Sequence, residues 1–163
     1  ITKLFHWISV IGLVIQIPLG FYLVRQEFSD FRITIEEIHV LIGIVIFYIT
    51  LLRLLFRLFF KSPDDPIEAF SGQMIIAKLN HFLLYLTLLT VTSSGILKKL
   101  FNGEKLNFGI TEIKLKTNFD YADLSYDVHI YSNYTLIALI SLHILAALLH
   151  TFVFKDNVIK RIT

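Results

Sequence analysis

Four long apolar stretches alternate with shorter polar segments along the chain, over residues 4–24, 38–60, 79–97 and 128–154. Each has close to or more than the roughly 20 residues that an α-helix needs to cross about 30 Å of hydrocarbon. Asp and Glu are absent from all four stretches. The pattern therefore predicts one all-α domain over residues 1–163, an integral membrane bundle of four helices.

The composition supports a chain solvated largely by lipid. Hydrophobic residues make up 55% of the 163 residues, and the mean hydropathy is +0.69, which is too apolar for an ordinary soluble domain of this length. We expect the lipid bilayer as a partner and no nucleic acid. The absence of cysteine excludes disulfides, thiolate metal sites and covalent attachment of a c-type haem.

Two of the polar connections carry local signals. Ser62-Pro63-Asp64-Asp65-Pro66 predicts a turn, and the amphipathic residues 67–77 after it are expected to lie along the membrane interface. The connection over residues 98–127 is long and mixed in charge, and Asn102-Gly103 predicts a turn near its start.

Orientation rests on the basic residues, of which the inner segments hold eight and the outer ones seven if the N-terminus lies inside. This count favours cytoplasmic N- and C-termini by a small margin. The chain begins at Ile1, so we expect further residues before it. We expect no cleaved signal, because the first span is itself a long helix with functional-looking residues.

Histidines near the ends of the spans are the strongest chemical signal. His129 and His143 are 14 residues apart on one helix, which separates them by about 21 Å and keeps them within about 40° of one face. His39 begins the second span at the same outer depth as His129, whereas His6 near the inner end can pair with His143 or His150. Two bis-histidine sites stacked across a bilayer predict two haems and electron transfer between the membrane faces. The alternative for each imidazole is a bond to a backbone carbonyl of a neighbouring helix.

Two arginines share a helix face with His39. Arg53 lies 14 residues and Arg57 18 residues after it, close to whole numbers of turns. A guanidinium can grip a carboxylate with two hydrogen bonds, so both are candidates to hold the propionates of the inner haem. Contact with lipid phosphates is the alternative, equally supported for Arg57.

The remaining histidines, His81 and His150, are candidates for a quinone or proton site, since imidazole can donate to a quinone carbonyl or relay a proton. Capping a helix or binding a lipid head group is the alternative. Gly43, one turn after His39, is expected to leave room for a flat ring.

Several short motifs together resemble one family over essentially the whole chain. They are His6-Trp7, Ile38-His39-Val40, Arg53-Leu54-Leu55-Phe56-Arg57, His81-Phe82-Leu83-Leu84-Tyr85, Leu142-His143, and His150 through Lys155-Asp156-Asn157. This order resembles the bacterial cytochrome b561 family, and most closely its small stand-alone members that oxidise superoxide. One departure is Thr151, where such members tend to carry a second histidine after His150.

The resemblance implies a bacterial inner-membrane protein with two b haems. It pairs His39 with His129 for the outer haem iron and selects His143 over His150 as the partner of His6 for the inner one. It also implies that electrons pass from superoxide to ubiquinone, the acceptor.

Three functions are compatible with these features to different degrees. The first is the superoxide oxidase, for which the lysines of the third connection, Lys98, Lys99, Lys105, Lys114 and Lys116, offer a funnel for the anion. The second is a haem-bearing anchor subunit that takes electrons from a redox partner protein, a dehydrogenase or hydrogenase. The third, a metal-ion transporter, fits poorly because the spans hold no carboxylates.

Overall fold

The computed structural model describes residues 2–60, 72–109 and 111–156. Within these residues it contains the long helices α1 (Thr2–Val24), α2 (Asp30–Phe59), α3 (Gln73–Phe101) and α4 (Phe119–Leu149), and α4 continues into a turn of π-helix, η1 (His150–Phe154). All four are long and apolar enough to cross a membrane. The predicted all-α membrane bundle is thereby confirmed.

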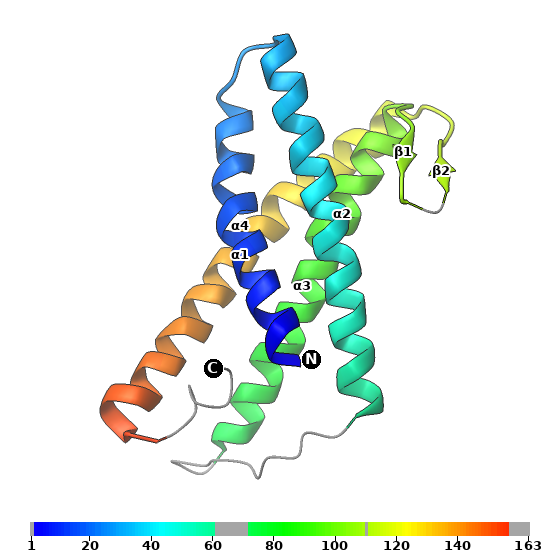
Figure 1. Cartoon of the computed structure of the whole chain (residues 1–163). Coiled ribbons are helices and arrows are strands. Elements are labelled where there is room, and N and C mark those ends of the chain that lie inside the picture. The colour runs from blue at the N-terminus through cyan, green and yellow to red at the C-terminus, as the bar shows by residue number, and fades with distance from the viewer. Residues whose placement is uncertain (1, 61–71, 110, 157–163) are drawn as a thin grey trace.

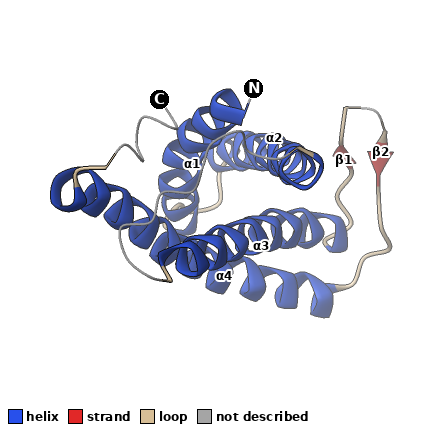
Figure 2. Cartoon of the chain, turned by 90° about the horizontal axis from the view of Figure 1, so that it is seen from below, coloured by secondary structure: helices blue, strands red, loops and turns tan. Residues whose placement is uncertain are grey.

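The helices are arranged as two antiparallel pairs (Figures 1 and 2). α1 lies along α2, α3 packs along α4, and the contact of α2 with α3 joins the pairs. Figure 1 shows the α1–α2 connection at the same end as the end of α3 and the start of α4. We call this end the outer end and the opposite one, with the start of α3 and η1, the inner end.

Two helices begin well before the predicted spans because polar side chains cap them. The Ser29 hydroxyl accepts a hydrogen bond from the Arg32 backbone N–H at 3.2 Å at the start of α2, and the Asn118 amide oxygen accepts from Tyr121 N–H at 3.1 Å at the start of α4. Such caps satisfy N–H groups that a helix leaves unpaired. The first turns of both helices mix aromatic residues with charged ones, so the hydropathy pattern missed them.

The connection between α3 and α4 is shorter and more ordered than predicted. It contains the strands β1 (Leu106–Asn107) and β2 (Glu112–Ile113), paired antiparallel. The predicted turn at Asn102-Gly103 is present, and Gly103 adopts φ 81°, where a side chain would be strained.

The connection between α2 and α3 differs from the prediction where the structure describes it. Gln73–Ala77 form the first turns of α3 rather than a separate interfacial segment. The predicted turn over residues 62–66, and residues 67–71, lie outside the described residues.

The interior combines a small apolar cluster with buried hydroxyls. Ile46, Leu88, Val91 and Leu136 form the cluster. Buried Thr50 and Thr92 donate to carbonyls of their own helices, at 2.7 and 2.8 Å, so they present little unsatisfied polarity to neighbouring helices. Small residues let membrane helices approach closely. Most large apolar side chains face outward, where lipid covers them.

Candidate functional site

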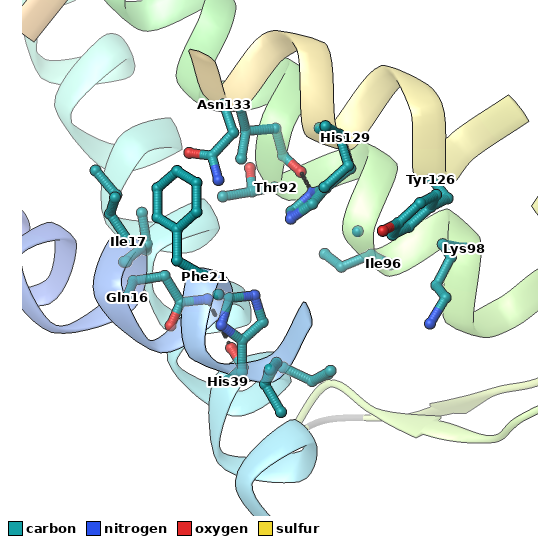
Figure 3. A pocket seen from close by; sticks show the side chains of 18 of the residues that line it. Gln16, Ile17, Phe21, His39, Thr92, Ile96, Lys98, Tyr126, His129 and Asn133 are labelled. Carbon is teal, nitrogen blue, oxygen red and sulfur yellow. Dashed lines mark hydrogen bonds between the residues drawn. The ribbon is translucent and has the colours of Figure 1, made fainter. Parts of the chain in front are cut away.

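A cavity of about 370 Å³ lies in the outer half of the bundle and is lined by residues of all four long helices. Figure 3 shows His39 of α2 and His129 of α4 on opposite walls, with Gln16 of α1 beside His39. Pockets of this size are typical of small-molecule and cofactor sites. The predicted outer pair is therefore brought together around an open space.

The two imidazoles face each other at a separation that suits one metal ion. Their ring centres are 6.2 Å apart. A metal–imidazole bond of about 2 Å and a distance of about 1 Å from nitrogen to ring centre, taken twice, give about 6 Å. A haem iron between His39 and His129 fits this spacing.

The hydrogen bond of His129 leaves its Nε2 available to bind a metal. Its Nδ1 lies 2.8 Å from the backbone oxygen of Val91. A carbonyl only accepts, so Nδ1 carries the proton and Nε2 keeps its lone pair. Histidine ligands commonly have such a partner on the second nitrogen, which orients the ring.

His39 and Gln16 carry an unusual pair of unsatisfied atoms. The Gln16 amide nitrogen donates to the His39 backbone oxygen at 2.8 Å. Among the described residues, the buried Gln16 Oε1 and His39 Nδ1 have no hydrogen-bond partner. A native interior rarely leaves such atoms unexplained. A protonated Nδ1 and an amide oxygen are complementary, and that arrangement would again leave Nε2 of His39 to face the cavity.

Glycines leave room at both rings. A Cβ at Gly95 would lie 3.0 Å from Nδ1 of His129, and one at Gly20 would lie 3.3 Å from Cε1 of His39. Gly43, expected to leave room for a flat macrocycle, lines the cavity, and a Cβ there would approach Gln16 Nε2 to 3.3 Å. Side chains at Gly95 and Gly20 would push the imidazoles from their present positions.

At its outer end the cavity is lined by four charged side chains, Arg32, Glu36, Lys98 and Lys99. Glu36 accepts from Arg32 at 3.2 Å, from Lys98 at 3.5 Å and from Lys99 at 3.1 Å. Lys99 also pairs with Glu104. The mouth of the cavity is thus cationic. Of these four side chains, the sequence had indicated only the two lysines as candidates to attract an anion.

A second cluster of polar groups lies toward the inner end. The ring of His143 is 5.3 Å from that of His81, and the Asn80 amide nitrogen lies 3.4 Å from His143 Nδ1. His6 contacts Arg53 through its Nδ1. The structure therefore places His143 beside His81, whereas the contact shown for His6 is with Arg53.

The arginines contact this cluster. Arg53 Nη2 donates to Nδ1 of His6 and Nη1 donates to the Ser9 hydroxyl, both at 3.2 Å. The Arg53 and Arg57 guanidinium carbons each lie 5.7 Å from the centre of the Tyr85 ring, within cation–π range. Arg57 is the more exposed of the two.

His150 occupies a separate buried position in η1. Its Nδ1 donates to the Asp156 carboxylate, and Gln73 Nε2 donates to its Nε2 at 3.0 Å. Both ring nitrogens are therefore engaged, and His150 is buried, with the residue 9% exposed. Turns of π-helix inside longer helices are often found at functional sites.

Arg53 offers a test at the inner cluster. If an inner haem is bound beside Arg53, Arg53→Leu should lower its reduction potential by on the order of 50–100 mV, because the loss of one nearby positive charge destabilises the reduced state by about 2 kcal/mol. Redox titration followed by visible absorption measures this. Arg57→Leu should shift the potential by less, since the more exposed charge of Arg57 is better screened. An equal shift in both variants would contradict a specific role of Arg53.

A bundle of membrane helices whose facing imidazoles come from different helices is characteristic of membrane b-type cytochromes. The chain belongs to the prokaryotic cytochrome b561 family, which matches residues 1–163. It is accordingly a membrane electron-transfer protein, and the family implies binding of haem b.

Similar proteins cover nearly the whole chain. "Cytochrome b561 homolog 2" of Escherichia coli is 28% identical over 99% of this chain and 88% of its own length. "Probable superoxide oxidase CybB" of Yersinia pestis is 30% identical over 96% of this chain and 89% of its own. "Cytochrome b561 homolog 1" of Escherichia coli is 27% identical, over 96% and 90%.

Proposed function

We propose that this chain holds two b haems, oxidises superoxide on the outer side of a bacterial inner membrane, and passes the electrons to ubiquinone. One observation carries the proposal: His39 and His129 face each other 6.2 Å apart in a cavity whose mouth is cationic. The similarity to a probable superoxide oxidase supports the choice of substrate. The termini then lie in the cytoplasm.

In this proposal four imidazoles ligate the two irons. His39 and His129 hold the outer haem, and His6 and His143 hold the inner one. Bound haem supplies reversible one-electron chemistry. Asn80 can orient His143, because an amide can also turn its oxygen toward a protonated Nδ1.

Arg53 and Arg57 are proposed to bind the propionates of the inner haem. In the present arrangement Arg53 donates to His6 Nδ1, which leaves the proton of His6 on Nε2. Ligation through Nε2 requires that proton to move to Nδ1 and Arg53 to turn away. A propionate near Arg53 would favour that change, since a guanidinium bonds a carboxylate more strongly than a neutral imidazole.

The outer mouth of the cavity is suited to a small anion. Lys98 and Lys99 lie at the mouth, and Lys105, Lys114 and Lys116 are exposed on the hairpin side of the same end. Positive charge around an opening raises the local concentration of an anion and its rate of encounter. Two superoxide ions each lose one electron and become O₂, and the two electrons with two protons convert ubiquinone to ubiquinol.

His150 and His81 are the proposed groups for the quinone or proton site at the inner end. The His150–Asp156 pair joins an imidazole to a carboxylate beside α3, a combination able to take up and release a proton. His81 lies against His143, which would bring it close to the inner haem.

The proposal predicts reduction of the haems by superoxide alone. A pulse of superoxide added to the purified, oxidised protein should produce the reduced b-type spectrum, and added ubiquinone should return it to the oxidised form. Stopped-flow absorption measures both steps. The reduction rate should fall as rising salt shortens the Debye length from about 30 to about 8 Å.

The competing function gives a different result. If superoxide leaves the haems oxidised while a dehydrogenase or hydrogenase partner reduces them, the chain is an anchor subunit and not a stand-alone oxidase. Inactivated superoxide solution is the control for the chemical background. A reduction rate independent of salt would remove the role proposed for the lysines.

A further inference from the structure

The charged groups at the mouth of the outer cavity form a connected set. Glu36 of α2 bridges to Lys98 and Lys99 of α3, and it also pairs with Arg32 one turn earlier on its own helix. The side chains are only partly exposed, from 12% for Lys99 to 31% for Lys98. Partly buried charges are costly unless they are balanced.

The set is not balanced within the cavity. Of the ionisable side chains of the described residues that line it, Arg32, Lys98 and Lys99 are cationic and Glu36 is anionic, so the lining carries two more positive than negative charges. Glu104 offsets part of this from outside the lining. A haem brings two carboxylates, which would balance the remaining positive charge of the lining.

The positions of the cations relative to the histidines fit the same ligand. Arg32 precedes His39 by seven residues, which is about 10 Å along the helix, and Lys98 and Lys99 follow Gly95, which adjoins His129, by about one turn. All three therefore lie on the outer side of the facing rings. A flat ring between the two imidazoles would direct one edge toward them.

We propose that Arg32, Lys98 and Lys99 bind the two propionate carboxylates of the outer haem, while Glu36 holds the three cations in place between α2 and α3. Arg32 can grip one carboxylate with two parallel hydrogen bonds, and the lysine ammonium groups act as point charges. This inference rests on the outer haem of the proposed function, but it does not depend on superoxide as the substrate.

Removal of the cations should loosen the outer haem. In Lys98→Gln/Lys99→Gln, the outer haem should transfer to an excess of a haem-scavenging globin about tenfold faster or more, because charge-assisted hydrogen bonds are lost. Arg32→Gln should act in the same direction. The inner haem should remain in place and reports that each variant is folded. Lys114→Gln/Lys116→Gln removes the same charge from the hairpin outside the cavity, and should not change the transfer rate.

The carboxylates themselves can be tested with an altered cofactor. Each protein is reconstituted with haem or with haem dimethyl ester, which lacks free carboxylates. With the ester, the unaltered chain and the double lysine variant should release the outer cofactor at the same rate. Two results would overturn the inference. The variant could still release the ester faster than the unaltered chain, or it could release native haem at the same rate as the unaltered chain. In either case the cations act only as an ion-pair network between helices.

The outcomes separate the inference from the proposed function. An unaltered chain that holds no outer haem would contradict both. A chain that holds the outer haem through these cations but is not reduced by superoxide would keep the inference and contradict the oxidase function. Reduction by superoxide, together with equal release rates from every variant, would keep the oxidase function and contradict the inference.

Discussion

His129→Ala should leave the purified protein with about one haem per chain in place of two. The outer iron would lose one of its two imidazoles, and alanine offers no replacement opposite His39. His39→Ala should have the same effect for the same reason. Extraction of haem with quantitation against protein measures the change, and a difference spectrum shows which component is lost.

Asn133→Ala is the matched control, because Asn133 lines the same cavity from the same helix and is assigned no iron. It should retain both haems. Two haems per chain in His129→Ala would instead mean that His129 is an ordinary interior histidine, held by its bond to the Val91 carbonyl. That was the competing interpretation of each histidine from the sequence alone.

Much of the outer site was accessible from the sequence because both candidate ligands begin apolar stretches. A membrane helix fixes depth by residue count, so His39 and His129 at matched depths were expected to meet, and their rings lie 6.2 Å apart. Residue count says nothing about which neighbouring helix a side chain meets. Gly20 and Gly95, which clear the two rings, could not be distinguished from glycines that serve ordinary helix contacts.

Gln16 and Glu36 were missed for a related reason. Gln16 is a polar residue inside an apolar span. That pattern predicts a position in the interior of the bundle, but it does not identify the group that Gln16 bonds. Glu36 stands three residues before His39, in a segment taken as the connection between the first two spans. Its contacts with Lys98 and Lys99 come from a helix more than 60 residues away, and single-sequence patterns do not report such contacts.

The inner cluster was the least predictable part. His6, His143 and His150 lie at inner positions whose depths, counted along different helices, overlap. The structure distinguishes these histidines by the hydrogen-bond partners of their ring nitrogens rather than by their depth. His150 has both nitrogens engaged, by Asp156 and by Gln73, whereas the contact of His143 with Asn80 uses only Nδ1.

The choice between His143 and His150 yields the second large effect. His143→Ala should remove the inner haem and lower the haem content to about one per chain, whereas His150→Ala should keep both. An iron ligand needs a free lone pair on one nitrogen, and in His150 Nδ1–H is donated to Asp156 while Nε2 accepts from Gln73. Only His143 also stands 14 residues from His129 on nearly the same face of one helix.

The two variants are each other's control, because they remove the same group two turns apart in one helix. Haem quantitation, with low-temperature spectra of the reduced proteins to identify which haem is missing, distinguishes the outcomes. His150→Ala with two haems but slower reoxidation by ubiquinone would agree with a quinone or proton role at that position. The reverse pattern, with haem lost in His150→Ala and retained in His143→Ala, would move the inner iron toward η1 and separate it from the cluster of His6, His81 and Arg53.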